Sequence, residues 1–445
     1  MPRSAAKLKL PEEAAPMSAA EARDKRVIVA GAGPVGLIAA LALARQGLDV
    51  TLVGQSVSEG GGRTVALFRH SVEILEELGA WTALAQQAAP LRKLRIIDDT
   101  GNLFRWRPLT FQASEIGLDA FGWNIEAGLL SAALRRLVEA VPSIRLVDGV
   151  FAEPRFGADM ASLSVESESG AGGRSCLEAA LIVAADGQRS PSRQAAGIRS
   201  RAEKLRQTAI TAILSHARPH GDVSTELHMR GGPCTLVPLP PATAEVGGRG
   251  RTAEAGVRPF PHRSSLVWML REGEAARIGG LDDDAFASTL EKRVHSILGK
   301  MRVAGPRGMV PLASLEVARL NGLRLALVGE AAHAFPPIGA QGLNLGLRDA
   351  ATLATLAGEA WRDGEDIGGE AVLDAYDRAR QGDVSTRAGV VAAMNRSLLS
   401  TFLPVDLARG LGMAALDLIP PLRHFVMREG VAPGFASRHR PLGLR

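Results

Sequence analysis

Residues 26–53 constrain the fold of this chain more than any other segment. A short apolar run from Arg26 to Ala30 predicts a strand, and a glycine-rich turn follows it directly. An Ala/Leu-rich stretch to about Arg45 predicts a helix, and Val50 to Val53 predicts a second strand. This order of strand, Gly-x-Gly-x-x-Gly, helix and strand is typical of a dinucleotide-binding unit. The segment therefore predicts an α/β fold of the Rossmann type.

The three glycines of this turn each have a physical reason. We expect Gly31 to allow the tight turn, Gly33 to let the backbone approach a pyrophosphate, and Gly36 to let helix and strand pack closely. Pro34 stands between them, at the predicted start of the helix. These four residues are the first predicted cofactor contacts.

The end of the second strand departs from the pattern. A fingerprint of this kind usually has Asp or Glu there, bound to the adenosine ribose, but this chain has Gly54 and Gln55. Either the Gln55 amide takes over the hydroxyl contacts, or another part of the chain holds the ribose. Our hypothesis is that Gln55 is the contact, that the dinucleotide binds less tightly than in relatives with an acid, and that Gln55→Glu tightens it.

A second segment, residues 325–349, predicts the opposite side of the same site. Leu325 to Val328 predict a buried strand, which passes through Gly329 and Glu330 into a loop rich in proline and glycine. Apolar residues then recur at helical spacing. The start of this helix should expose unpaired N–H groups, which favour negative charge, near Gly342, Leu343 and Asn344. The carboxylate of Glu330 is placed to accept hydrogen bonds from sugar hydroxyls.

This second segment closely resembles the third cofactor motif of the flavin-dependent aromatic hydroxylases, and among them the ubiquinone-biosynthesis hydroxylases. Their signature runs close to H-P-x-x-G-Q-G-x-N-x-G-x-x-D, and the chain keeps Gln341, Gly342, Asn344, Gly346 and Asp349. It has Pro336, Ala340 and Glu330 where the family often has His, Gly and Asp. The resemblance implies FAD as cofactor, with the anionic edge of the reduced flavin at the helix start, and we expect Pro336, Pro337 and Ile338 to help form the wall of a dry pocket.

Two further motifs carry the same resemblance. A G-R-T-x-A-L run places Arg63 where the family has a flavin-contacting arginine; the alternative is a surface arginine in a loop. An apolar strand ending at Ala185 leads into Asp186 and Gly187, which match the segment that lies beside the pyrophosphate and serves pyridine-nucleotide binding. The alternative for Asp186 is a simple turn residue. Relatives often have Asn or Gln at the position of Ala127, so we assign no contact there.

The resemblance implies a fold of the p-hydroxybenzoate hydroxylase type, with an inserted antiparallel-sheet substrate domain and C-terminal helices. We expect a disordered tail at 1–24, an FAD-binding domain from 25–92, 122–200 and 305–365, a substrate domain from 93–121 and 201–304, and a helical region at 366–445. Finer expectations are a strand at 103–106, a loop insertion at 242–261, and helices at 370–391 and 397–426. The apolar side chains of the last stretch, including Leu398, Phe402, Leu407, Leu411 and Met413, should pack on the chain's own domains; contact with a membrane or partner enzyme is the alternative.

Composition excludes several other classes of function. The net charge of +5 is spread without a block of Lys or Arg, and Tyr376 is the only tyrosine, so we expect no nucleic-acid partner. Cys176 and Cys234 form no C-x-x-C pair, and His216 and His220 have no evident third ligand, so we expect no metal site. No apolar run reaches the ~18 residues of a membrane span. We expect a cytoplasmic protein, and peripheral attachment to the inner membrane is compatible with the sequence.

The resemblance also implies a reaction. NAD(P)H reduces the FAD, O₂ adds to the reduced flavin, and the flavin C4a-hydroperoxide transfers one oxygen atom to an electron-rich ring. We assign no catalytic side chain: His333 is a candidate base, and a structural histidine behind the loop is the favoured alternative. Three functions stay open. They are ring hydroxylation of a polyprenylated phenol in ubiquinone biosynthesis, hydroxylation of a small soluble aromatic, and a non-catalytic FAD-binding role in a biosynthetic complex.

Overall fold

The computed structural model describes residues 25–55, 62–101, 106–167, 174–241, 260–400 and 402–431, and its first large sheet contains the predicted Rossmann strands. This six-stranded sheet has the order β19-β20-β12-β1-β2-β8, and only the β19–β20 pair is antiparallel. Its strands are β1 (Arg26–Ala30), β2 (Asp49–Val53), β8 (Ile144–Val147), β12 (Leu181–Ala184), β19 (Asn321–Gly322) and β20 (Leu325–Leu327). Apolar residues dominate β1, β12 and β20 because both faces of the sheet are covered.

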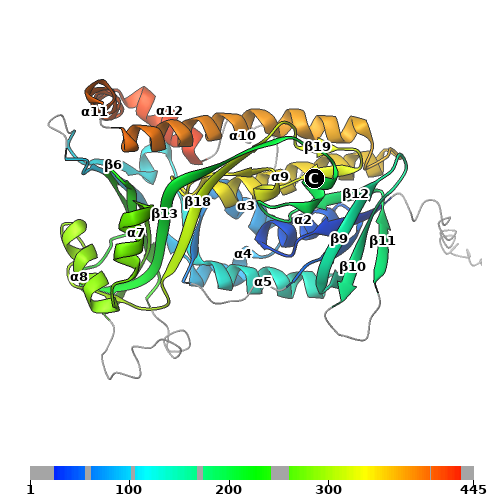
Figure 1. The fold of residues 1–445 in the computed structure, drawn as a ribbon, viewed down its shortest axis with the longest axis horizontal. Helices are drawn as coiled ribbons and strands as arrows, with labels where there is room; N and C mark the ends of the chain where they lie inside the picture. Colours follow the sequence, from blue (N-terminus) through cyan, green and yellow to red (C-terminus); the bar gives the residue numbers. More distant parts are fainter. Residues whose placement is uncertain are drawn as a thin grey trace, which may run out of the picture.

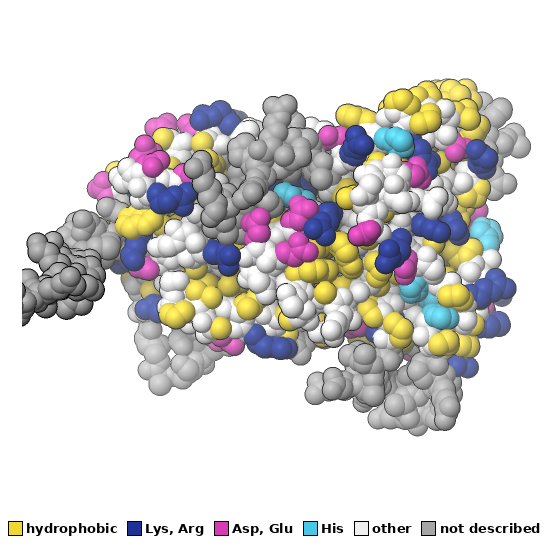
Figure 2. Space-filling model, turned by 180° about the vertical axis from the view of Figure 1, so that it is seen from behind, with side chains coloured by type: hydrophobic (Ala, Val, Ile, Leu, Met, Phe, Trp, Pro, Cys, Tyr) yellow, Lys and Arg dark blue, Asp and Glu magenta, His cyan; other side chains and the backbone are white. Residues whose placement is uncertain are grey.

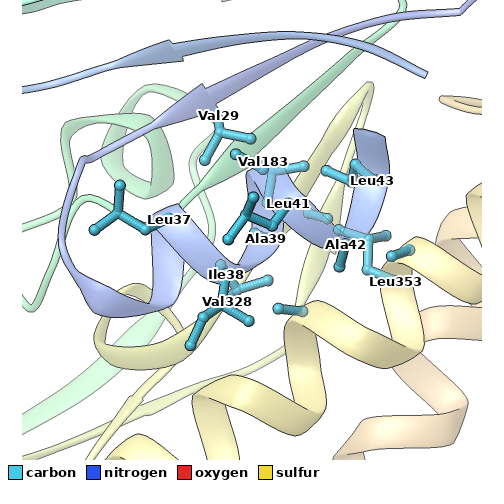
Figure 3. Packing of buried hydrophobic residues seen from close by; sticks show 14 of the residues in the cluster. Val29, Leu37, Ile38, Ala39, Leu41, Ala42, Leu43, Val183, Val328 and Leu353 are labelled. Carbon is cyan, nitrogen blue, oxygen red and sulfur yellow. The ribbon is translucent and has the colours of Figure 1, made fainter. Parts of the chain in front are cut away.

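Helix α2 (Pro34–Arg45) lies at the centre of the core beside this sheet. It begins with proline, which is favoured in the first turn of a helix because its missing N–H would have no partner there. Figure 3 shows α2 with Val29 and Val183 of the sheet on one side and Leu353 of α9 (Gln341–Arg362) on the other. A helix covered on both sides must be apolar nearly all round, and α2 is.

The second large sheet is antiparallel apart from one pair. It has nine strands in the order β21-β18-β13-β16-β15-β14-β5-β6, with β17 paired to β13, and only β14 and β5 run parallel. Its strands are β5 (Lys93–Asp98), β6 (Leu109–Gln112), β13 (Ser200–His216), β14 (Val223–Met229), β15 (Gly232–Leu239), β16 (His262–Arg271), β17 (Met301–Val303), β18 (Gly308–Val317) and β21 (His333–Ala334). The long strands β13 and β18 run from this sheet toward the first one (Figure 1). The predicted domain limits stay a prediction.

Two smaller sheets, further helices and short 3₁₀ turns accompany the two large sheets. One three-stranded sheet joins β3 (Thr64–Phe68), β7 (Gly122–Glu126) and β4 (Ala89–Pro90), and another joins β9 (Gly149–Phe156), β10 (Ala161–Ser167) and β11 (Ser175–Ala179). Within the described ranges, the remaining helices before the C-terminal region are α3 (Arg69–Glu77), α4 (Trp81–Leu84), α5 (Ala127–Ala140), α6 (Pro191–Ala195), α7 (Glu272–Gly279) and α8 (Asp283–Arg293). Short 3₁₀ turns occur at η1 (Ala85–Gln87), η2 (Ala113–Ile116) and η4 (Gly329–Ala331).

The C-terminal region is helical, as predicted, with different boundaries. Helix α10 (Glu370–Leu399) is unbroken and spans both sheets (Figure 1). It is followed by α11 (Leu403–Leu418) and α12 (Pro420–Val431). Pro404 and Pro420 therefore stand in the first turns of helices rather than interrupting one, where the missing N–H of proline is harmless.

Three finer expectations need correction or lie outside the described residues. The strand predicted at 103–106 falls almost entirely on residues 102–105, which lie outside the described part of the chain, and the next described strand is β6 at Leu109–Gln112. The tail at 1–24 and residues 242–259 of the insertion also lie outside it. In the last helices Leu398 and Met413 are buried as expected, but Phe402, Leu407 and Leu411 are exposed. The packing prediction was wrong for these three. Among the described residues, no helix has the length and apolar character to cross a membrane.

Candidate cofactor site

The three cofactor motifs meet at one edge of the first sheet. The last residues of β1, β12 and β20 are paired across the sheet, Ala30 with Ala184 and Ala184 with Leu327. Because these strands are parallel, the segments that follow their carboxyl ends lie together. Ligands of open α/β sheets bind in the crevice outside these ends. The glycine turn, the Asp186 segment and the Gly329 segment therefore surround one location.

The glycines of the first motif lie against the second motif. Gly31 has φ +111°, and a Cβ there would lie 2.3 Å from the carbonyl oxygen of Ala185. A Cβ on Gly36 would lie 1.8 Å from the carbonyl oxygen of Gly31. Gly33, which caps α2, has no atom within 4 Å of its Cβ position. The turn is thus packed tightly against other backbone at Gly31 and Gly36, whereas the Cβ position of Gly33 has no close protein neighbour. This open backbone at a helix start fits a pyrophosphate, and its contacts with FAD stay a prediction.

The missing acid at the end of β2 has a packing explanation. A Cβ on Gly54 would lie 2.5 Å from the backbone nitrogen of Ala32. No side chain fits at position 54 unless the glycine turn moves. Gln55 is exposed and follows directly. It is therefore the position at which a side chain can reach the ribose from this strand.

We expect Gln55→Glu to lower the Kd for FAD by roughly three- to tenfold, because a carboxylate accepts stronger hydrogen bonds from ribose hydroxyls than an amide does. Fluorescence titration of the apoprotein with FAD measures this change. Gly54→Glu is the matched control and should weaken binding, since its Cβ meets Ala32. Unchanged or weaker binding by Gln55→Glu would contradict the hypothesis.

Asp186 has an unsatisfied oxygen at the centre of this edge. Its Oδ2 accepts a hydrogen bond from the Ser192 backbone N–H at 3.1 Å. Its Oδ1 is buried and has no hydrogen-bond partner among the described residues. Burial raises the pKa of Asp186, although hydrogen bonds from Ser190 and Ser192 oppose the rise. Buried polar atoms are nearly always hydrogen-bonded, so this oxygen fits a ligand hydroxyl. Gly187 follows Asp186 directly and turns the chain there with φ +78°.

The start of α9 is uncapped and open. Its N-cap, Ala340, is in the left-handed conformation with φ 51° and makes no side-chain cap hydrogen bond. A Cβ on Gly342 would meet no atom within 4 Å. The first N–H groups of this 22-residue helix therefore have no side-chain cap at Ala340, and the space beside Gly342 is free of protein atoms. This is the electrostatic setting predicted for the anionic edge of a reduced flavin.

The side chain of Asn344 connects the start of α9 to earlier parts of the chain, and the predicted cofactor contact of its backbone N–H stays a prediction. Its side chain is buried, and its Nδ2 donates to the carbonyl oxygens of Ala66 at 2.8 Å and Ala340 at 2.7 Å. Its Oδ1 accepts from Phe68 N at 2.8 Å and Ser71 Oγ at 2.7 Å. Asn344 thus fixes β3 and α3 against the start of α9.

Arg63 is exposed, and it lies next to β3, the strand that Asn344 holds against the start of α9. It directly precedes β3, and no hydrogen bond or ion pair joins its side chain to another residue in the described ranges. A guanidinium that is free of protein partners can reach a pyrophosphate or a flavin carbonyl. Its flavin contact stays a prediction.

The other predicted contacts of the third motif differ in exposure. Glu330 is exposed in the 3₁₀ turn after Gly329, where its carboxylate can meet sugar hydroxyls. Pro337 is half-buried, and Leu343 packs partly against the main core. Gln341 accepts a hydrogen bond from Arg387 at 2.5 Å, which connects the motif to α10. The strand pairing brings the predicted residues that follow β1, β2, β12 and β20 to one edge of the sheet, and Gln341, Leu343 and Asn344 are partly or wholly engaged by the protein.

A buried ion network that the sequence did not reveal supports the Gly329 turn. Asp349 accepts hydrogen bonds from Gly329 N at 3.1 Å and from Arg380 Nε at 2.7 Å, and its Oδ2 lies 2.6 Å from His333 Nε2. Burial alone would raise the pKa of Asp349, but His333 and Arg380 outweigh burial and lower the pKa to about 2. Since Nε2 of His333 is engaged by Asp349, the structural alternative for this histidine is favoured over a catalytic base.

The network continues along α10. Asp383 lies 2.8 Å from Arg348, 2.9 Å from Arg380 and 2.9 Å from Arg387. Arg380, Asp383 and Arg387 are spaced three and four apart on one predicted helix, and this spacing is the only signal of the network that is local in the sequence. Their partners on α9 are more than thirty positions earlier in the chain, and nothing local links the two helices.

This network predicts a specific loss of stability in acid. The pKa of Asp349 falls from 3.8 in the unfolded reference to about 2, which stabilises the folded state by about 2 kcal/mol at neutral pH. The contribution is complete above pH 4 and disappears as the pH falls toward 2. Urea unfolding at pH 7, 4 and 3 measures it, with Asp349→Asn as the control whose pH slope should be flatter. Equal slopes would show that Asp349 does not carry the effect.

Known proteins are similar to this chain in sequence and in fold. The family model described as an FAD binding domain matches residues 24–388. Ubiquinone hydroxylase UbiL of Rhodospirillum rubrum is 30% identical over 427 residues, which cover 95% of this chain and 92% of UbiL. Ubiquinone hydroxylase UbiM of Neisseria meningitidis is 26% identical over 91% of this chain and 84% of its own. The crystal structure of p-nitrophenol 4-monooxygenase PnpA from Pseudomonas putida superposes with a TM-score of 0.68 at 16% identity, covering 94% and 98% of the two chains.

The solved structure bears on the fold alone, and it confirms the predicted α/β flavoprotein class. The family model supports FAD as the cofactor, in agreement with the open turn at Gly33, the unsatisfied Asp186 oxygen and the uncapped helix start. The match to the FAD binding domain and the 30% identity with UbiL extend over most of the chain. This protein therefore belongs to the ubiquinone-hydroxylase family of FAD-dependent aromatic-ring monooxygenases.

Proposed function

We propose that this protein hydroxylates the aromatic ring of a polyprenylated phenol in ubiquinone biosynthesis, with NAD(P)H and O₂ as co-substrates. The single observation that carries the proposal is the meeting of the three cofactor motifs at one sheet edge beside an uncapped helix start. The names of the relatives, ubiquinone hydroxylases, support the substrate class. Bound FAD supplies the redox and oxygen-activating chemistry, and the protein supplies placement, charge and exclusion of water.

An apolar cluster beside the third motif supports an apolar aromatic substrate. We name it the Ile338 cluster, and its buried members are Ala209, Met269, Leu312, Ile338 and Val391. It joins the large antiparallel sheet to the loop before α9 and to α10. A dry wall of this kind excludes water, which would otherwise intercept the activated oxygen. The ring of the phenol would lie between this wall and the flavin.

The last two helices support a peripheral contact with the inner membrane, where a polyprenylated phenol resides. Large apolar side chains of this region are exposed: Phe402, Leu407, Leu411, Leu418, Ile419, Leu422, Phe425 and Val426. We name them the α11–α12 face, and Figure 2 shows hydrophobic side chains gathered at the upper right, where these helices lie. Exposed apolar side chains gathered on one face are typical of interaction surfaces. A partner enzyme of a biosynthetic complex is the alternative occupant.

Two measurements test the proposed function. Purified holoenzyme should oxidise NAD(P)H faster when a polyprenylated phenol is added, and it should yield a ring-hydroxylated product. Flavin absorbance without stimulated oxidation would favour the non-catalytic role. The quinone intermediates of a deletion strain should include the unhydroxylated phenol and identify the ring carbon. Normal ubiquinone in that strain would reject the proposal and favour a small soluble aromatic as substrate.

A further inference from the structure

A groove lies between the end of α10 and the start of α11. Its volume is about 420 Å³, and its walls are largely apolar. Ala393, Met394 and Ser397 of α10 form one wall, and Pro404, Val405 and Ala408 of α11 form the other. Small-molecule sites in proteins commonly have volumes of this order and apolar walls.

The inner end of the groove adjoins the Ile338 cluster. Met394 lines the groove and also packs against that cluster. The Met394 side chain therefore links the groove to the wall proposed for the aromatic ring. Methionine is unbranched and adaptable, so it can move aside for an apolar ligand without a polar penalty.

The outer end continues onto the α11–α12 face. Phe402, two residues before Pro404, is 65% exposed, and Leu411, one helical turn beyond Ala408, is 62% exposed. The groove thus adjoins the Ile338 cluster through Met394, and exposed apolar residues of the α11–α12 face flank its α11 wall in the sequence.

The polar groups beside the groove are already used by the protein. The Ser397 hydroxyl donates to the Met394 carbonyl oxygen at 2.8 Å. The guanidinium of Arg409 donates to Ser397 O at 3.1 Å, to Thr100 Oγ1 at 3.0 Å and to Asp406 Oδ1 at 3.0 Å. An extended peptide in the groove would need partners for its own backbone N–H and C=O groups. A hydrocarbon chain needs none, and the groove therefore favours one.

Both walls are held in place. Asn395 of α10 donates to Gln207 Oε1 on β13 at 2.9 Å, and Arg409 of α11 reaches Asp98 Oδ2 on β5 at 3.4 Å. The groove therefore exists before a ligand arrives, which lowers the entropic cost of binding.

We propose that the α10–α11 groove binds the polyprenyl chain of the substrate, with the aromatic ring beyond Met394 and the far end of the chain at the α11–α12 face. The inference rests on the proposed function and specifies how its substrate is held.

Two variants that fill the groove test the proposal by kinetics. Ala393→Phe and Ala408→Phe place a ring between the walls, and the holoenzymes are assayed in detergent micelles. One substrate is a phenol with a long polyprenyl chain, and the other is the same phenol with a single prenyl unit. We expect kcat/KM for the long chain to fall about tenfold or more, since several apolar groups lose burial, and kcat/KM for the short chain to stay unchanged. The control Ala379→Phe, at an exposed position of α10 outside the groove, should affect neither substrate.

A photolabelling experiment separates this proposal from the proposed function. A diazirine at the middle of a long polyprenyl phenol should label residues of 393–408 in the wild-type holoenzyme, and the label should be lost in Ala393→Phe. Labelling there without turnover of either phenol would refute the hydroxylase function and retain the groove. Labelling elsewhere, or equal loss of kcat/KM for both phenols, would overturn the groove proposal. Unchanged kinetics with loss of a co-purifying enzyme would overturn it in favour of a protein partner. Circular dichroism and flavin content show that each variant is folded.

Discussion

Replacing Asp349 with alanine is expected to lower the free energy of unfolding by about 3–5 kcal/mol, because it leaves buried charge without a partner. Arg380 and His333 would lose the carboxylate that both contact, and Gly329 N would lose its acceptor. The Gly329 turn should loosen as a result, and the protein should purify with little flavin. Urea unfolding and the ratio of flavin to protein absorbance measure the two effects.

A matched control separates buried from exposed charge. Glu139 pairs with Arg135 at 2.9 Å, but its side chain is 50% exposed. Glu139→Ala should therefore change stability by no more than about 1 kcal/mol and leave the flavin content unchanged. If Asp349→Ala retained full flavin and wild-type stability, the Gly329 turn would have to be held by something other than this network.

Gly36→Ala is expected to destabilise the protein and to remove most of its FAD. The new Cβ would lie 1.8 Å from the Gly31 carbonyl oxygen and 3.3 Å from Ala185 Cβ, so α2 and the glycine turn must move apart. Forced insertion of this kind costs about 2–3 kcal/mol. The same displacement of the pyrophosphate cradle would weaken FAD binding by roughly a hundredfold. Thermal unfolding of the apoprotein and FAD titration measure the two losses separately.

Gly33→Ala provides the contrast. Gly33 has φ −73°, which alanine adopts readily, and its Cβ would meet no protein atom within 4 Å. We expect unchanged stability of the apoprotein and weaker FAD binding, because the methyl group would enter the space above the turn. Equal FAD affinity in Gly33→Ala and the wild type would show that the pyrophosphate does not approach this glycine.

The sequence by itself determined the fold class, the family and the cofactor. These depend on patterns that are local in the chain, such as a run of apolar residues, glycines at fixed spacing, or the start of an apolar-periodic helix. The strand at Arg26–Ala30 and the helix that begins at Gln341 form as predicted for this reason. The interpretation of Gly31 and Gly36 was correct because the close approach that each permits involves the turn itself or the strand beside it.

Only the tertiary structure decided which of these residues stay open at the candidate site and which hold the site together. Asn344 belongs to the motif, yet its hydrogen bonds join it to β3, more than 270 positions earlier in the chain. The pairing of Asp349 with Arg380, the contact of Gly54 with Ala32, and the exposure of Phe402 likewise depend on which elements become neighbours in space. A hydrogen bond or an ion pair between distant segments leaves no periodic pattern in the sequence, because it requires one partner at one position and places no demand on the residues around it.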